Sequence, residues 1–263
     1  MDRRGVRAAG PGLWIAAAAG LAMMALLAAV GFGLIGQARA VAPTGDVGAA
    51  DTLAAALPAF GWGVLALIGV AVLDIVVAWG LWGVLRGERP GGAALAAAFR
   101  VAYAAVFLGA IAMLVDARRI AMAAGEASDL AVGDRDAAVL LRFEGFDSAW
   151  NTGLLVFGVH LLIVGWLVAT RSGVFATVAG WLVVLAGAGY LADGVVRVIA
   201  PDVTFPIARF TFIGEIVLIA WLTVGGIRAA RSRGHAAAET ETETETETET
   251  ETARVLVGGG AGR

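Results

Sequence analysis

The 263-residue chain has no cysteine and no lysine, and it has only two histidines, His160 and His235. The absence of cysteine excludes disulfides, thiolate metal sites and cysteine nucleophiles. Two histidines are too few for a His-rich zinc site. The catalytic patterns G-x-S-x-G, H-E-x-x-H and the P-loop are also missing. We therefore expect no metal, no cofactor and no enzymatic activity.

Neither positive nor negative charge is in clear excess once the C-terminal repeat is set aside. The formal net charge is −3, with 19 basic and 22 acidic residues, but seven of the acids lie in one repeat at 239–252. Residues 1–238 hold 17 arginines and 15 acidic residues. Because nucleic-acid binding requires a clear basic excess, this near balance predicts no nucleic-acid partner.

Long hydrophobic runs dominate the rest of the chain. Mean hydropathy is +0.83 and 59% of the residues are hydrophobic. Six stretches approach or exceed the roughly 20 residues that a ~30 Å hydrocarbon core requires: 13–35, 60–85, 93–115, 149–170, 174–196 and 207–227. The loops are too short for a separate soluble domain. We predict an all-α six-transmembrane-helix bundle over residues 1–234, with the lipid bilayer as its surroundings and an oligomeric state left open.

The first span has features of a cleaved signal peptide. Arg3, Arg4 and Arg7 form a basic start, and the Ala-Arg-Ala sequence at 38–40 resembles a cleavage site. However, the apolar run at 13–35 has 23 residues, whereas the apolar region of a signal peptide has about 7–15. A retained transmembrane helix is therefore our prediction, with cleavage as the alternative.

The arginines also predict the orientation, because cytoplasmic loops carry more of them. With the N-terminus inside, nine are cytoplasmic and seven external. The N-terminal cluster and the short connections 86–92 and 171–173 carry most weight. Six spans then place both termini in the cytoplasm, in the inner or plasma membrane of a bacterium. Trp14, Trp62 and Trp150 fall toward span ends, which is typical of an interfacial aromatic belt.

Two segments outside the spans have patterns of their own. In the external loop 116–148, residues after Asp134 recur at helical spacing, which predicts either a short helix on the membrane surface or an extension of the next span into water. At 239–252 the chain repeats Glu-Thr seven times. The repeat has nothing apolar to bury, so we predict that residues 235–263 form a disordered acidic tail.

Small residues recur every seven positions in the fourth and fifth spans. Spacing of seven returns to nearly the same helix face, and small residues let two helices in lipid approach closely. We therefore predict an antiparallel hairpin in which the two stripes face each other. The predicted packing residues are Gly158, Gly165, Gly173, Gly180, Gly187 and Gly194.

Four ionisable side chains lie inside predicted spans and away from their ends. Asp74, His160 and Glu215 are each followed by an arginine 11–13 residues later. At ~1.5 Å per residue they share a level roughly 16–20 Å from the cytoplasmic end. Arg100 lies in the cytoplasmic half of the third span, where a guanidinium is costly unless it is paired. We predict Asp74 as its partner, with Glu215 second.

Three interpretations of these four residues stay open. They form a neutralised structural pair that fixes helix packing, or a site that binds or translocates a small solute, an ion or a proton, or a site for acid–base chemistry. A binding site predicts that Asp74, Arg100, His160 and Glu215 line one cavity, whereas a structural pair predicts no pocket. His160 faces about 200° away from Gly158, so the fourth span must contact helices on both sides.

Several segments together carry a resemblance to a known family. They read FDSAWNTGLLVFGVH at 146–160, LAGAGYLAD at 185–193, FRVAY at 99–103 and FIGE at 212–215. Over residues 10–230 the chain resembles the bacterial membrane family called domain of unknown function 4386. Where that family has Ser-Gly-x-x-Pro, this chain reads SGVFA at 172–176. The resemblance implies a six-span integral membrane protein with no assigned activity and no catalytic residues.

Overall fold

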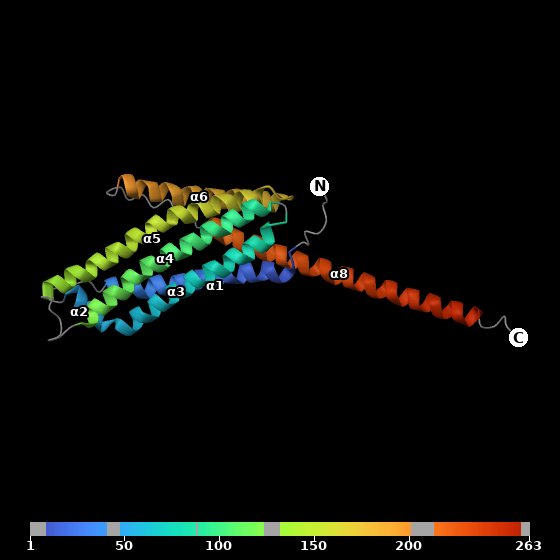
Figure 1. The fold of residues 1–263 in the computed structure, drawn as a ribbon, viewed down its shortest axis with the longest axis horizontal. Coiled ribbons are helices and arrows are strands. Elements are labelled where there is room, and N and C mark those ends of the chain that lie inside the picture. Colours follow the sequence, from blue (N-terminus) through green and yellow to red (C-terminus); the bar gives the residue numbers. More distant parts are fainter. Residues whose placement is uncertain (1–8, 41–47, 88, 124–131, 201–212, 259–263) are drawn as a thin grey trace.

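The computed structural model describes residues 9–40, 48–87, 89–123, 132–200 and 213–258, with side chains described up to His235 (Figure 1). The described residues form helices and short connections, without a strand. The helices are α1 (Pro11–Ala40), α2 (Ala49–Ala55), α3 (Leu57–Leu85), α4 (Pro90–Met122), α5 (Val132–Ala169), α6 (Val174–Ile199) and α8 (Ile213–Gly258).

All six predicted spans are confirmed as helices long and apolar enough to cross a membrane: α1, α3, α4, α5, α6 and α8. Residues 207–212 of the sixth predicted span lie outside the described residues. The short helix α2 was not predicted. Its seven residues contain one aspartate and one threonine and show no long apolar run, so the sequence carried no signal for it.

The six spans form a closed ring in chain order. Each packs on the span before it and the span after it, and α8 returns to pack on α1. Because six antiparallel crossings bring the chain back to its starting side, the N-terminal end of α1 and the outward extension of α8 lie at the same end of the bundle (Figure 1). We refer to the opposite end, where α2 lies, as the α2 end.

The outer surface of the ring is apolar. Trp62, Trp79 and Trp181 expose 68%, 60% and 59% of their surfaces, and many aliphatic side chains beside them are exposed as well. Water-soluble monomers rarely expose apolar surface on this scale, whereas helices in lipid keep their backbone groups paired and present apolar side chains outward. The chain is an integral membrane protein.

Helix α5 is long enough to continue beyond the hydrocarbon region at the α2 end. α5 has 38 residues, about 57 Å at ~1.5 Å per residue, nearly twice the core thickness. It begins at Val132, so the alternative that the helical pattern after Asp134 extends the next span is confirmed, and residues 132–148 do not form a separate surface helix. Asp136 on this extension accepts a 2.8 Å hydrogen bond from the Ala50 amide, and Arg39 pairs with Asp147 at 2.6 Å. These contacts tie α1, α2 and α5 together.

The glycine stripes of α5 and α6 face each other as predicted. A β-carbon placed on Gly165 would lie 2.7 Å from the Gly180 carbonyl oxygen, and one on Gly187 would lie 2.7 Å from the Gly158 carbonyl oxygen. Only hydrogen fits between these backbones. Gly194 ends the stripe against Leu155.

The prediction that Gly173 belongs to the packing stripe is wrong. A β-carbon there would meet nothing within 4 Å, and the residue has φ of 109°. Gly173 instead supplies the left-handed backbone conformation that turns the chain between α5 and α6, which L-residues rarely adopt.

α8 continues past the bundle, and its C-terminal part projects away from the other helices (Figure 1). The Glu-Thr repeat lies in this projecting part. Glutamates four residues apart in a helix repel each other, and threonine is a weak helix former, so the sequence of the repeat does not favour a helix. Disorder of residues 235–263 therefore stays a prediction.

The glycine seam predicts a position-specific effect of one added methyl group. Gly187→Ala should lower the free energy of unfolding by about 1–3 kcal/mol, because the methyl group overpacks the backbone contact. Gly109→Ala is the control, since a β-carbon there meets nothing within 4 Å, and it should be neutral or stabilise by up to about 1 kcal/mol. Unfolding by sodium dodecyl sulfate titration in mixed micelles measures both, and equal effects would contradict the seam.

Orientation in the membrane is a separate prediction. A reporter fused after Arg233 should be active only in a form that works in the cytoplasm, and one inserted at 127–134 only in a form that works after export. The physical reason is the arginine bias of the first helix and short loops. The reverse pattern of activity would contradict the predicted orientation while leaving the ring intact.

Candidate functional site

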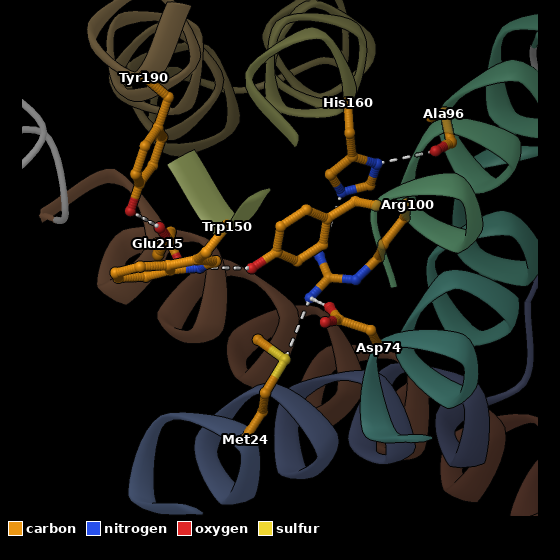
Figure 2. Close-up of polar contacts among 9 residues, drawn as sticks. Met24, Asp74, Ala96, Arg100, Trp150, His160, Tyr190 and Glu215 are labelled. Carbon is orange, nitrogen blue, oxygen red and sulfur yellow. Dashed lines mark hydrogen bonds and ion pairs between the residues drawn. The ribbon is translucent and has the colours of Figure 1, made fainter. Parts of the chain in front are cut away.

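A buried arginine stands at the centre of the bundle (Figure 2). Arg100 of α4 has no exposed surface. Its Nη2 lies 2.7 Å from Oδ1 of Asp74 on α3, and both side chains are 1% exposed. Nη1 lies 3.1 Å from Nε2 of His160 on α5, and Nη2 donates to the sulfur of Met24 on α1 at 3.4 Å. One guanidinium therefore connects four helices.

The hydrogen bonds of His160 identify its tautomer. Nδ1 lies 2.8 Å from the Ala96 carbonyl oxygen, which can only accept, so Nδ1 carries the proton. Nε2 is then the acceptor for the N–H of Arg100. His160 is thus a neutral ring that holds the guanidinium in place, and it is completely buried.

The contact between Asp74 and Arg100 is an ion pair rather than a well-directed hydrogen bond. The 2.7 Å approach is short, but its direction is poor, and neither Asp74 oxygen has a hydrogen-bond partner among the described residues. Oδ2 in particular is buried and unpartnered. Buried polar groups in proteins are almost always hydrogen-bonded, so this oxygen marks a position where the described residues of the bundle do not by themselves satisfy the carboxylate.

A cavity of about 720 Å³ lies beside Asp74, and all six spans contribute to its wall. Its residues come from the second half of α6, the start of α8 and the middle of the other spans. The cavity therefore occupies the half of the bundle toward the α2 end. Besides Tyr103 and Trp150, the described polar residues of its wall are Asp74, Asn151, Tyr190, Asp193, Arg197 and Glu215.

Glu215 faces this cavity from α8 and is hydrogen-bonded to the neighbouring helix α6. The Tyr190 hydroxyl donates a 2.7 Å hydrogen bond to Glu215 Oε1 (Figure 2). On the other side, Trp150 Nε1 donates to the Tyr103 hydroxyl oxygen at 3.3 Å. Aromatic side chains thus hold the polar groups of the wall in fixed positions.

The predicted pairing of Arg100 with Asp74 is confirmed, and the four predicted residues divide into two groups. Asp74 and Glu215 line the cavity, whereas Arg100 and His160 lie outside its described lining and support Asp74 from within the bundle. The prediction that all four line one cavity is therefore wrong for these two. The second-choice pairing of Arg100 with Glu215 is not formed, because Glu215 bonds to Tyr190.

The other end of the bundle is closed by packed side chains. Arg171, in the turn between α5 and α6, donates to the Val84 carbonyl oxygen at 2.7 Å. Its guanidinium lies 5.7 Å from the ring centroids of both Trp14 and Trp221, which themselves lie 4.9 Å apart. This cluster joins α1, α3, α8 and the α5–α6 turn at the end of the bundle opposite the α2 end.

Comparison with known proteins agrees with this architecture. The family described as domain of unknown function (DUF4386) matches residues 17–226. The chain belongs to this family. The match includes Asp74, Arg100, His160 and Glu215 and stops before the Glu-Thr repeat, so the DUF4386 unit is the six-span ring.

One relative outside the bacteria is similar to the chain. An uncharacterized protein of Archaeoglobus fulgidus is 27% identical over 165 residues, which is 63% of this chain and 84% of that protein. No solved structure matches. Membership in DUF4386 therefore establishes the membrane architecture and assigns no activity.

Sequence reasoning did not find four polar wall residues. Asn151, Tyr190 and Asp193 stood in segments that carried the family resemblance, but no rule identified them as cavity residues, and Arg197 had only been placed as an external charge. A signal did exist, because Tyr190, Asp193 and Arg197 follow one another at spacings of three and four on one face of a membrane helix. Trp150 was predicted to lie in the interfacial belt, and it instead lines the cavity.

The ion pair predicts a double-mutant result. Arg100→Leu and Asp74→Leu should each destabilise the protein by about 3–5 kcal/mol, because each leaves a buried charge without its counter-ion. The double variant should recover much of the folded protein, since two apolar residues often replace a buried pair at little cost. The amount of monodisperse protein extracted from membranes measures this.

A matched control is Arg119→Leu, which removes an arginine whose side chain is 78% exposed and should change little. If the double variant is as damaged as the two single variants combined, Asp74 and Arg100 do not stabilise each other.

Proposed function

We propose that the protein binds a small solute in the cavity between its six spans. The observation that carries the proposal is Asp74, which is 1% exposed, lines the cavity and has a carboxylate oxygen without a hydrogen-bond partner among the described residues. Ionisable groups inside a membrane are retained mainly where they serve a function. The volume of about 720 Å³ lies within the range of small-molecule sites.

A purely structural role accounts for less of this arrangement. An ion pair that only fixed helix packing would be served best by a dry, filled interior, because packed cores leave few voids larger than water. Here the pair borders a large space, and the wall on its far side carries Asp193 and Glu215. A buried pair supported by His160 and Met24 instead provides a rigid base for a binding site.

Translocation is a second candidate, favoured by the unequal ends of the bundle. The cavity occupies the half toward the α2 end, while the Arg171, Trp14 and Trp221 cluster closes the other half. A site in one half of the membrane domain, with the other half closed by packed side chains, is the arrangement that alternating-access carriers show in each of their states. This candidate requires a second arrangement in which that cluster separates.

The absence of cysteine gives a direct test of the proposed site. A cysteine introduced at Ala28, which lines the cavity, should react with methyl methanethiosulfonate, because only a thiolate in contact with water is reactive. A cysteine at Ala105, on the exposed outer face of α4, should react far more slowly in lipid. Mass spectrometry of the intact protein measures both rates. Equal, slow rates would show that no solute-accessible space exists.

Gene deletion and complementation test whether the cavity has a function in the cell. Deletion of the gene should alter growth or metabolite profiles, and wild-type protein should reverse the change. Ala28→Trp, which places a bulky ring in the cavity, should fail to reverse it, while Ala105→Trp should succeed. If Ala28→Trp is folded and complements as well as the wild type, the cavity has no role and the structural interpretation is favoured.

A further inference from the structure

The chemistry of the cavity wall indicates which solutes it accepts. We infer that the cavity binds a monovalent organic cation with an apolar body, such as a protonated primary or secondary amine bearing an aromatic or aliphatic group. This inference rests on the proposed function and adds the class of ligand. It follows from the charges of the wall, the aromatic side chains between them and the unpartnered oxygen of Asp74.

The charges of the wall favour a cation. Among the residues that the structure describes, its acidic and basic members are Asp74, Asp193, Glu215 and Arg197. Asp74 is balanced by Arg100 behind it, whereas the hydrogen bond of Glu215 comes from the neutral hydroxyl of Tyr190. Arg197 is exposed, near the end of α6, whereas Asp193 is 8% exposed. The inner part of the wall is therefore acidic, and its field acts in a medium of low dielectric constant, where charge interactions are strong.

Aromatic rings fill the wall between these carboxylates. They are Phe32, Tyr103, Phe107, Trp150, Phe157 and Tyr190. Phe157 lies 4.9 Å from Tyr103 and 5.6 Å from Tyr190, measured between ring centroids. Such a set of rings around an acidic group is the usual way in which proteins recognise ammonium groups.

One cation already occupies a position of this kind. The Arg100 guanidinium lies 5.4 Å from the centroid of the Phe157 ring and 2.7 Å from Asp74. The same ring and the same carboxylate also form part of the cavity wall. The remaining oxygen of Asp74 has no hydrogen-bond partner among the described residues and is covered by neighbouring side chains, so an N–H of a ligand reaches it only when those side chains move aside.

An inorganic cation fits this wall less well. Magnesium and calcium require about six oxygen ligands, and the described residues contain no group of three or more aspartate, glutamate or histidine side chains placed to hold a metal. Apolar and aromatic side chains cannot replace a hydration shell, but they can contact the carbon atoms of an organic ion.

The experiment uses the full chain with cysteine at Ala28 and three probes of one skeleton: 3-phenylpropylammonium, 3-phenylpropanol and 3-phenylpropanoate. Each is tested for its ability to slow modification of the thiol by methyl methanethiosulfonate. The ammonium should protect at a concentration about tenfold lower than the alcohol, as expected for a desolvated contact between a cation and aromatic rings. The carboxylate should protect least.

Substitutions in the wall complete the test. Glu215→Gln keeps an oxygen acceptor for Tyr190 and removes the charge, so the ammonium should lose most of its advantage over the alcohol. Glu144→Gln makes the same change at an exposed position of α5 and should leave the advantage intact. If Glu215→Gln protein does not fold, Asp193→Asn serves the same purpose.

The outcomes separate the two proposals. Equal protection by all three probes, better protection by the alcohol or carboxylate, or protection by none overturns the inference, while reactivity of the thiol still supports an accessible cavity. An unreactive thiol at Ala28 removes the cavity as a site and both proposals with it. An ammonium advantage that survives both Glu215→Gln and Asp193→Asn also overturns the inference.

Discussion

The structure depends on the need to keep one guanidinium charge inside the membrane. Arg100 has no exposed surface, and a charge in this environment is tolerated only with a partner. Asp74 supplies the opposite charge, His160 accepts one N–H, and Met24 contacts the other nitrogen. Because these residues belong to four different helices, satisfying a single side chain fixes α1, α3, α4 and α5 relative to one another. The apolar packing of the remaining surface follows from that arrangement.

The need to neutralise Arg100 also explains why protein surrounds the arginine of the ion pair, whereas the aspartate lies beside a cavity. Arg100 and His160 are enclosed by protein, whereas Asp74 borders a cavity. Only Oδ1 of Asp74 forms the ion pair with Arg100, and Oδ2 has no hydrogen-bond partner among the described residues. The α5–α6 seam contributes as well, because the close approach at Gly158 and Gly187 holds two cavity walls together without side chains between them. Rigid walls reduce the cost of ordering a site when a ligand binds.

Sequence patterns predicted the six spans, the glycine seam and the Arg100–Asp74 pair, because each depends on position along a helix and on simple costs of burial. They did not predict which side chains surround the cavity. Trp150 shows the reason: its distance from the span end placed it at the interface, but its rotation about the helix axis, set by contacts with Tyr103 and Phe32, directs it inward. Helix α2 and the pairing of Glu215 with Tyr190 likewise depend on tertiary contacts that a linear pattern does not contain.

The chain-order ring has a consequence for biogenesis. Each span packs on its immediate predecessor, so helices leaving the translocon find their neighbours at once, and these local contacts favour rapid assembly. The contact between α8 and α1 is the exception, since it joins the two ends of the membrane domain. Until α8 is inserted, the nascent bundle is an open arc whose polar interior faces lipid on one side. A chaperone or insertase that shields such an arc, and a protease that removes chains truncated before α8, would therefore act on the same intermediate.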